Sequence, residues 1–191
     1  MASITNNGYG SYSKQIDGIG NRIVIGESTF LKGTKFRIIG NNNTVTIGEK
    51  CFIGKGCSFW MEGNNISITI GDKNTFTCIC HLNAQEDGSS IKIGNDCMFS
   101  NNIIVRTSDS HPIYDLQTNQ RINPARNIVI GNHVWIAPQT IIMKGAEIAN
   151  GAIIGSRTFV TKKIPENSLA VGAPAKVVKT NVYWSRENII N

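Results

Sequence analysis

Apolar residues recur at every sixth position along most of this chain. The longest uninterrupted series lies towards the C-terminus and consists of Ile130, Ile136, Ile142, Ile148, Ile154 and Val160. Three shorter series precede it: Ile47, Ile53 and Phe59; Ile70, Phe76 and Leu82; Ile93, Phe99 and Val105. This spacing matches neither the helical period of about 3.6 residues nor the strand period of about two. The pattern therefore indicates short strands joined by regular corners.

Glycine and small residues accompany the apolar series at fixed positions. Glycine often follows the apolar residue directly, as at Gly26, Gly48, Gly54, Gly71, Gly94, Gly131 and Gly155. A small or β-branched residue often stands four positions after it, as at Thr29, Cys51, Cys57, Cys97, Thr140, Ala146, Ala152 and Thr158. Together these features form the signature of a hexapeptide β-helix. Three such units close one triangular coil of about 18 residues, and each coil buries its apolar face by stacking on its neighbours.

The coils are not all of equal length. Ile25, Ile47, Ile70 and Ile93 begin successive coils at spacings of 22, 23 and 23 residues. We expect the extra residues in the turn-forming segments 40–43, 63–65 and 87–89, which are rich in Gly, Asn, Asp and Ser. Between Val105 and Ile130 the series breaks, and residues 106–127 form one longer excursion. Long loops on rigid repeat scaffolds commonly carry functional residues.

Composition supports one all-β domain over residues 1–191. The chain has 30 Ile and 10 Val but only 4 Leu, together with 22 Asn and 19 Gly, which favours strands and tight turns over helices. We expect an N-terminal cap at residues 1–22, a β-helix at 23–178 with its loop at 106–127, and a tail at 179–191. Residues 182–188 of the tail are predicted to hold a short helix.

Charge and cysteine content narrow the possible partners. The net charge of +6 favours an anionic partner, but no basic run alternates with aromatic residues, so nucleic acid is not expected. The N-terminus lacks a signal-peptide pattern and no long apolar run occurs, so we expect a cytoplasmic protein without membrane insertion. The 5 cysteines form no C-x-x-C pair, which predicts buried free thiols and no cysteine-rich zinc site.

Residues 93–179 resemble the hexapeptide-repeat acyltransferases. The similarity is strongest to sugar O-acetyltransferases of the galactoside and maltose acetyltransferase type and to enzymes that acetylate bacterial capsule or lipopolysaccharide. It rests on six segments in order, namely residues 107–112, 130–137, 144–146, 154–156, 160–165 and 171–177. The resemblance implies a left-handed parallel β-helix, a homotrimer, active sites between subunits, and acetyl transfer from acetyl-coenzyme A to a sugar hydroxyl.

Histidine is the natural candidate for the base in such a transfer. A sugar hydroxyl is a poor nucleophile until its proton is removed, and histidine titrates near neutrality. The chain has three histidines. Of these, His111 lies on the long excursion, precedes Pro112 and matches the catalytic position of the family, so it is the predicted base. Asp109 is a candidate to orient the imidazole through its second ring nitrogen, although a backbone carbonyl is the alternative.

Further site residues follow from the resemblance. His81 stands where several relatives carry an asparagine that contacts the acceptor or the acetyl group. His81 and nearby Asn83 are therefore candidate acceptor-binding residues, with subunit packing as the alternative for His81. Trp135 borders the active site in the family and is expected to shape the acceptor or thioester pocket. His133 is given no role.

The coenzyme A contacts implied by the family fall in the C-terminal part of the chain. They are Ala137, Pro138, Gly155, Ser156, Thr161, Lys162, Lys176 and Lys179. The first four are expected to act mainly through backbone groups. With Lys163, the three lysines form a basic cluster suited to the phosphates of the cofactor. An ordinary solvated basic surface is the alternative.

Direct transfer is expected because no Ser, Cys or Lys is flanked by the groups that activate a covalent nucleophile. Three other functions compete with this one. N-acetylation of an amino-sugar nucleotide is the strongest, although an N-terminal nucleotide-binding domain is missing from the sequence. A zinc enzyme needs three converging histidines, and His81, His111 and His133 lack the required close spacing, so no metal is expected. A noncatalytic scaffold would leave the lysine cluster and the His-Pro loop without a role.

Overall fold

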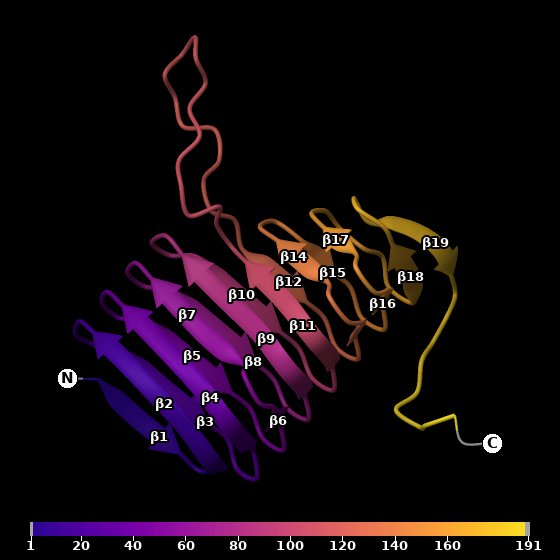
Figure 1. Cartoon of the computed structure of the whole chain (residues 1–191), viewed down its shortest axis with the longest axis horizontal. Coiled ribbons are helices and arrows are strands. Elements are labelled where there is room, and N and C mark those ends of the chain that lie inside the picture. The colour runs from indigo at the N-terminus through magenta and orange to yellow at the C-terminus, as the bar shows by residue number, and fades with distance from the viewer. Residues whose placement is uncertain (1, 190–191) are drawn as a thin grey trace.

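The computed structural model describes residues 2–189 and confirms an all-β parallel β-helix. Successive strands stack along one axis, from the N-terminal coil at one end to the C-terminal strands at the other (Figure 1). Within the described residues no helix is present, and hence none that is long and apolar enough to cross a membrane. Each coil has three sides, which we call faces 1, 2 and 3 in chain order.

Faces 1 to 3 are built from parallel strands. Face 1 contains β1 (Ser3–Asn6), β3 (Arg22–Ile25), β5 (Thr44–Ile47), β8 (Ser67–Ile70), β10 (Ser90–Ile93), β12 (Ile128–Ile130) and β15 (Glu147–Ile148). Four long strands bend from face 2 into face 3, namely β2 (Tyr9–Asp17), β4 (Phe30–Ile39), β9 (Thr75–Gln85) and β11 (Met98–Arg106). Face 2 is completed by β6 (Phe52–Ile53), β13 (Trp135–Ile136), β16 (Ile153–Ile154) and β18 (Ser168–Val171), and face 3 by β7 (Ser58–Glu62), β14 (Ile141–Met143) and β17 (Phe159–Val160).

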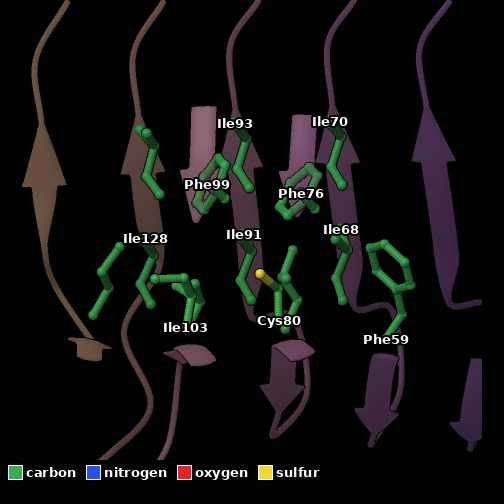
Figure 2. Close-up of a cluster of buried hydrophobic side chains, with 14 of the residues drawn as sticks. Phe59, Ile68, Ile70, Phe76, Cys80, Ile91, Ile93, Phe99, Ile103 and Ile128 are labelled. Atoms are coloured by element: carbon green, nitrogen blue, oxygen red, sulfur yellow. The ribbon is translucent and has the colours of Figure 1, made fainter. Parts of the chain in front are cut away.

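The six-residue apolar series forms the core as stacked columns of like residues. Phe36 lies over Phe59 at a ring-centroid distance of 5.1 Å, and Phe76 lies over Phe99 at 4.3 Å. Figure 2 shows the isoleucines of face 1 in similar rows, side by side on neighbouring strands. All of these side chains are buried. Burial of one such side chain contributes about 1.5–3 kcal/mol, so the repeat itself supplies the main driving force for stacking.

Asparagine and aspartate side chains join the coils at one corner. The Oδ1 atoms of Asp72, Asn95, Asn132 and Asn150 each accept a hydrogen bond of 2.7–2.8 Å from a backbone N–H of the preceding coil. These bonds satisfy amides that would otherwise lack a strand partner at the corner. This ladder accounts for part of the high asparagine content. Among the cysteines, Cys51, Cys57, Cys80 and Cys97 are buried, Cys78 is half-buried, and all five are free, as predicted.

The solenoid changes width along its length. In the coils before the excursion, faces 1 and 3 each gain an inward-facing residue, such as Ile68 on face 1 and Met61 on face 3, because their strands are longer. In the coils after it, β15 and β17 have 2 residues each. The extra residues of the 22- and 23-residue coils therefore extend strands as well as forming the expected turns at 40–43, 63–65 and 87–89. We call residues 3–106 the wide half and residues 128–180 the narrow half.

Both ends of the β-helix differ from expectation. Residues 3–17 of the predicted cap form a coil of their own, because β1 pairs with β3 and β2 pairs with β4. Its apolar residues do not follow the period of six, since one side of an end coil faces solvent. At the other end, β19 (Lys176–Thr180) pairs antiparallel with β18.

The helix predicted for residues 182–188 is wrong. This segment is extended and runs back over three coils. Trp184 Nε1 donates to the His133 carbonyl, and Arg186 donates to Asp96, Thr75 and the Lys73 carbonyl. These contacts to earlier coils override the local preference of the segment.

Candidate active site

The excursion forms an arm that leaves the solenoid at the step between the wide and narrow halves. It follows β11 on face 3, projects away from the coils, and returns to β12 on face 1 (Figure 1). Its outer part is a narrow loop closed by an antiparallel bridge between Tyr114 and Arg121. A turn centred on Asp115, whose Oδ1 accepts bonds from Gln117 and Thr118, forms the tip. We call residues 107–127 the arm.

Asn123 joins the two sides of the arm at its base. Its Nδ2 donates to the His111 carbonyl and to Asp109 Oδ2, both at 2.9 Å, and its Oδ1 accepts from the Ile113 N–H at 2.7 Å. The residue is only 7% exposed. One buried amide thus fixes the backbone on both sides of His111. Asn123 was not singled out from the sequence, because its partners on both sides of the arm become apparent only in the folded loop.

Asp109 contacts the narrow half. Lys144 Nζ lies 2.6 Å from Asp109 Oδ2 and also donates to the Asn123 carbonyl at 3.0 Å. The Lys144 ammonium, followed by the Asn123 amide, holds the pKa of the Asp109 carboxyl below its ordinary value. Asp109 therefore fixes the backbone that carries His111. A direct bond from Asp109 to the imidazole, which no contact within residues 2–189 provides, stays a prediction.

A second ion pair ties the arm to the wide half. Arg121 donates from both terminal nitrogens to the Glu86 carboxylate at 2.7 Å each. This bidentate pair, helped by a hydrogen bond from Ser108, lowers the pKa of Glu86 to about 2. Neither Glu86 nor Arg121 was singled out from the sequence, because a pairing of residues 35 positions apart leaves no local pattern.

His111 borders a cavity at the foot of the arm. The cavity has a volume of about 570 Å³ and is lined by Trp60, Glu62, Gln85, Glu86, Ser108, Ser110 and His111. The His111 side chain is exposed, while its main chain is held through Asn123. A fixed backbone beneath an accessible imidazole is an arrangement suited to proton transfer.

A second cavity adjoins the first on face 3. It has a volume of about 270 Å³ and is lined by Ser58, Trp60, His81, Asn83, Ile104 and Arg106. Trp60 lines both cavities, so the two are neighbours. His81 Nδ1 lies 2.7 Å from Ser58 Oγ. The structure thus brings the predicted acceptor residues His81 and Asn83 together, beside the cavity of His111.

Trp135 lies on a different side of the coil. It belongs to β13 on face 2, whereas the arm leaves from the end of face 3, so one chain does not bring Trp135 and His111 together. Its indole is tilted towards that of Trp184, with centroids 6.1 Å apart.

His133 has a role that the sequence did not indicate. Its ring stacks on Trp184 at 4.1 Å, and its Nδ1 is 2.7 Å from Asp96 Oδ2. His133 therefore anchors the C-terminal tail. The partners Asp96 and Trp184 are too far from it in sequence to form a recognisable motif.

The predicted cofactor residues fall into two groups in the narrow half. Thr161, Lys162 and Lys176 line a cavity of about 220 Å³ together with Lys163, Ile164, Pro174 and Ala175. Lys179 is exposed on β19 and lies outside this lining. The lysine cluster expected from the sequence is thus largely assembled around one cavity.

The second group lies where face 2 turns into face 3. Ala137 and Pro138 in one coil stack beside Gly155 and Ser156 in the next. The N–H groups of Ala137 and Gly155 donate to Ile154 and Ala170 of the following strands at 2.8 and 2.9 Å. These two amides are thus already used, whereas Ser156 is exposed at this corner. Among residues 2–189 no group of three His, Cys, Asp or Glu side chains is placed to hold a metal ion.

Comparison with known proteins gives a consistent assignment. Residues 127–162 match the family model described as bacterial transferase hexapeptide (six repeats). A polysialic acid O-acetyltransferase of Neisseria meningitidis is 35% identical over an alignment of 195 residues. The alignment covers 92% of this chain and 90% of that protein. A polysialic acid O-acetyltransferase of Escherichia coli O1:K1 / APEC is 39% identical over 100 residues, and there the match spans only 33% of the relative.

A solved structure extends the likeness to the whole fold. The polysialic acid O-acetyltransferase OatWY superposes with a TM-score of 0.79 at 29% identity, covering 98% of this chain and 92% of that one. The left-handed parallel β-helix expected from the sequence is thereby confirmed.

Proposed function

Because the chain belongs to the hexapeptide-repeat acetyltransferases, we propose that it transfers the acetyl group of acetyl-coenzyme A to a hydroxyl of a sugar in a bacterial surface polysaccharide. The observation that carries this proposal is the position of His111, held by Asn123 above a cavity that adjoins the pocket of His81 and Asn83. The polysialic acid named for the full-length relatives points to a polymer of acidic sugars as the acceptor class.

His111 acts as the general base in this proposal. It takes the proton of the acceptor hydroxyl while the hydroxyl oxygen attacks the thioester carbonyl carbon. The tetrahedral intermediate then collapses, the carbon–sulfur bond breaks, and the proton on His111 passes to the thiolate of coenzyme A. Asn123, Lys144 and Asp109 hold the backbone of His111 during these steps, which supports a fixed geometry for proton transfer.

Acetyl-coenzyme A would bind to the narrow half. Lys162, Lys163 and Lys176 converge on one cavity, which suits the phosphates of the nucleotide end. The pantetheine arm would pass the corner at Ala137, Pro138, Gly155 and Ser156, and Lys179 would add charge from β19. A donor of this kind leads us to expect that the enzyme works in the cytoplasm.

A homotrimer would complete the site. Trp135 and His111 lie on different faces of one chain, so both can border one reaction centre only if neighbouring subunits supply them. Sedimentation velocity at micromolar concentration tests this arrangement, and a trimer is expected. A stable monomer with full activity would refute the shared site.

The reaction is tested with the purified protein, acetyl-coenzyme A and a panel of glycan acceptors that present either hydroxyl or amino groups. We expect thiol release together with a gain of one acetyl group on a hydroxyl-bearing acceptor, measured by mass spectrometry. Transfer only to amino-sugar nucleotides would replace O-acetylation by N-acetylation. If no acceptor leads to thiol release, the proposed acetyl transfer is wrong and a noncatalytic scaffold is the remaining hypothesis.

A further inference from the structure

Outward-facing side chains of face 3 form a polar groove beside the cavity of His111. Trp60, Asn83 and Arg106 stand in register on β7, β9 and β11. Ser58 and His81 stand in register two positions earlier on β7 and β9. Neighbouring strands lie about 4.8 Å apart, so these five side chains fit within the span of a few sugar rings. They line the cavity of about 270 Å³ already described, and we call them the acceptor groove.

Arg106 is a cation without an acidic partner among the described residues. Its Nη2 donates to Ser110 Oγ at 2.6 Å, and none of the ion pairs within residues 2–189 includes it. The two carboxylates that anchor the arm are engaged elsewhere, because Glu86 is paired with Arg121 and Asp109 is paired with Lys144. Arg106 therefore retains charge and donor capacity for an anion that enters the groove.

Glu62 is an acidic residue in the cavity that adjoins the groove. It lies beyond Trp60 in the cavity of His111, where its Oε2 accepts a bond of 3.3 Å from Gln85 Nε2. It does not line the cavity that contains Arg106. Its carboxylate is thus placed to accept bonds from sugar hydroxyls, while the Arg106 side of the groove offers positive charge.

The neighbours of Arg106 add hydrogen-bond donors and a flat apolar surface. His81 Nδ1 lies 2.7 Å from Ser58 Oγ. When this hydroxyl donates to Nδ1, the Nε2 atom carries the ring proton and is a donor. The Asn83 amide provides further donors, and Trp60 is 37% exposed and offers a ring surface for a sugar. Arg37, whose guanidinium lies 5.2 Å from the Trp60 ring centroid, places a second cation further along the same column.

We propose that the acceptor groove binds the carboxylate of an acidic sugar unit, with Arg106 as the anchoring cation, His81 and Asn83 as donors and Trp60 as the platform. Arg106 suits a carboxylate because the guanidinium presents parallel donors to two oxygens. Trp60 lines both cavities. When one sugar unit is held in the groove, the next units of the same polysaccharide therefore lie beside His111. This subsite rests on the proposed acetyl transfer to a polysaccharide and names the feature of the acceptor that is recognised.

Binding in the absence of acetyl-coenzyme A tests the subsite separately from catalysis. The probes are a linear sialic acid oligomer and the same oligomer with its carboxyl groups reduced to alcohols, both titrated calorimetrically into the intact protein. We expect Arg106→Gln to weaken binding of the acidic oligomer by about 10-fold or more and to leave binding of the reduced oligomer within twofold. Arg106→Lys should lie between the two, and Lys92→Gln on face 1, which removes one exposed charge away from the groove, should match the wild type.

One further variant and the remaining binding outcomes decide whether Arg106 contacts the ligand directly. Ser110→Ala removes the bond between Arg106 and the arm but keeps the guanidinium, and we expect it to retain the preference for the acidic oligomer. A loss in Ser110→Ala as large as that in Arg106→Gln would overturn the proposal, because Arg106 would then act through the arm. Equal binding of both oligomers by the wild type, or no binding of either, would also overturn it. Failure of the proposed enzyme activity would instead appear as wild-type protein that binds the acidic oligomer through Arg106 yet releases no thiol.

Discussion

The wide and narrow halves share one repeat but differ in what their outer surfaces offer. In the wide half, strands on face 3 are longer, and one outward column of these strands carries Arg37, Trp60, Asn83 and Arg106. In the narrow half the strands are short, corners follow one another closely, and Lys162 and Lys176 converge on one corner cavity. The wide half thus has the extended surface on which we propose that the polymer binds, and the narrow half has the compact basic cavity proposed for the phosphates.

The arm connects these two surfaces. It emerges where wide coils give way to narrow ones, and each half holds it by one ion pair, Glu86 with Arg121 and Lys144 with Asp109. His111 lies between these anchors, beside the acceptor groove. In the proposed division of roles, the acceptor binds to the wide half, acetyl-coenzyme A binds to the narrow half, and His111 acts between them.

Removal of the imidazole should abolish most of the chemistry without affecting either half. We expect His111→Ala to lower kcat by about 10²- to 10⁴-fold, the usual contribution of a general base. Steady-state kinetics should show KM for acetyl-coenzyme A within a few fold of wild type, because His111 is not among the residues around the lysine cavity. Leu116→Ala, at the fully exposed tip of the same arm, is the matched control and should be fully active.

Removal of the Asn123 side-chain amide, which fixes the His111 backbone, should lower kcat less than removal of the imidazole does. Asn123→Ala removes bonds to Asp109, to the His111 carbonyl and to the Ile113 amide. We expect kcat to fall by about 10- to 100-fold through misplacement of the base, while KM for acetyl-coenzyme A stays constant. Gln117→Ala, on the exposed part of the arm, should behave as wild type. Equal losses in kcat and in cofactor affinity would show that Asn123 supports the fold at large and not the position of His111.

Substitutions in the lysine cavity should weaken the binding of acetyl-coenzyme A without weakening the binding of the acceptor. We expect Lys162→Ala or Lys176→Ala to raise KM for acetyl-coenzyme A by about 10-fold, because each loses a charge-assisted bond to phosphate. KM for the acceptor should change less than twofold in initial-rate measurements, and Lys92→Ala should change neither. Acceptor affinity that falls together with cofactor affinity would remove the division between the halves.

Acidification should loosen the arm from the wide half. The pKa of Glu86 is lowered to about 2 by Arg121, so the pair stabilises the arm at pH values above the ordinary glutamate pKa. This stabilisation is lost as pH falls from about 5 towards 2, and its size is modest because the pair is partly exposed. Hydrogen exchange of residues 107–127, corrected for intrinsic rate, should rise in this pH range. Glu86→Gln should show faster exchange already at neutral pH and a smaller further rise on acidification than wild type, because only the Asp109–Lys144 pair then remains to be lost.

The repeat could be predicted from the sequence more fully than the site, because the repeat depends on residues that are close together in the sequence. The columns of Ile and Phe follow from a period of six, and His111 stands out because residues 106–127 interrupt that period. The partners of the arm were not predictable, since Lys144 and Glu86 meet it only after the coils are stacked. The end coil at residues 3–17 escaped notice because its apolar residues face solvent on one side. Tail residues 182–188 were assigned wrongly because contacts to Asp96 and His133 override their local preference.

Hydrogen–deuterium exchange with each ligand alone and with both together tests the division of roles most directly. The account predicts that a sialic acid oligomer slows exchange in β7, β9 and β11 and at the adjoining corner, residues 85–90. Coenzyme A should slow exchange at residues 161–167 and 172–176, and the arm should be protected most when both ligands are present. If both ligands protect the same half, or if the oligomer protects only the narrow half, the division of roles is contradicted.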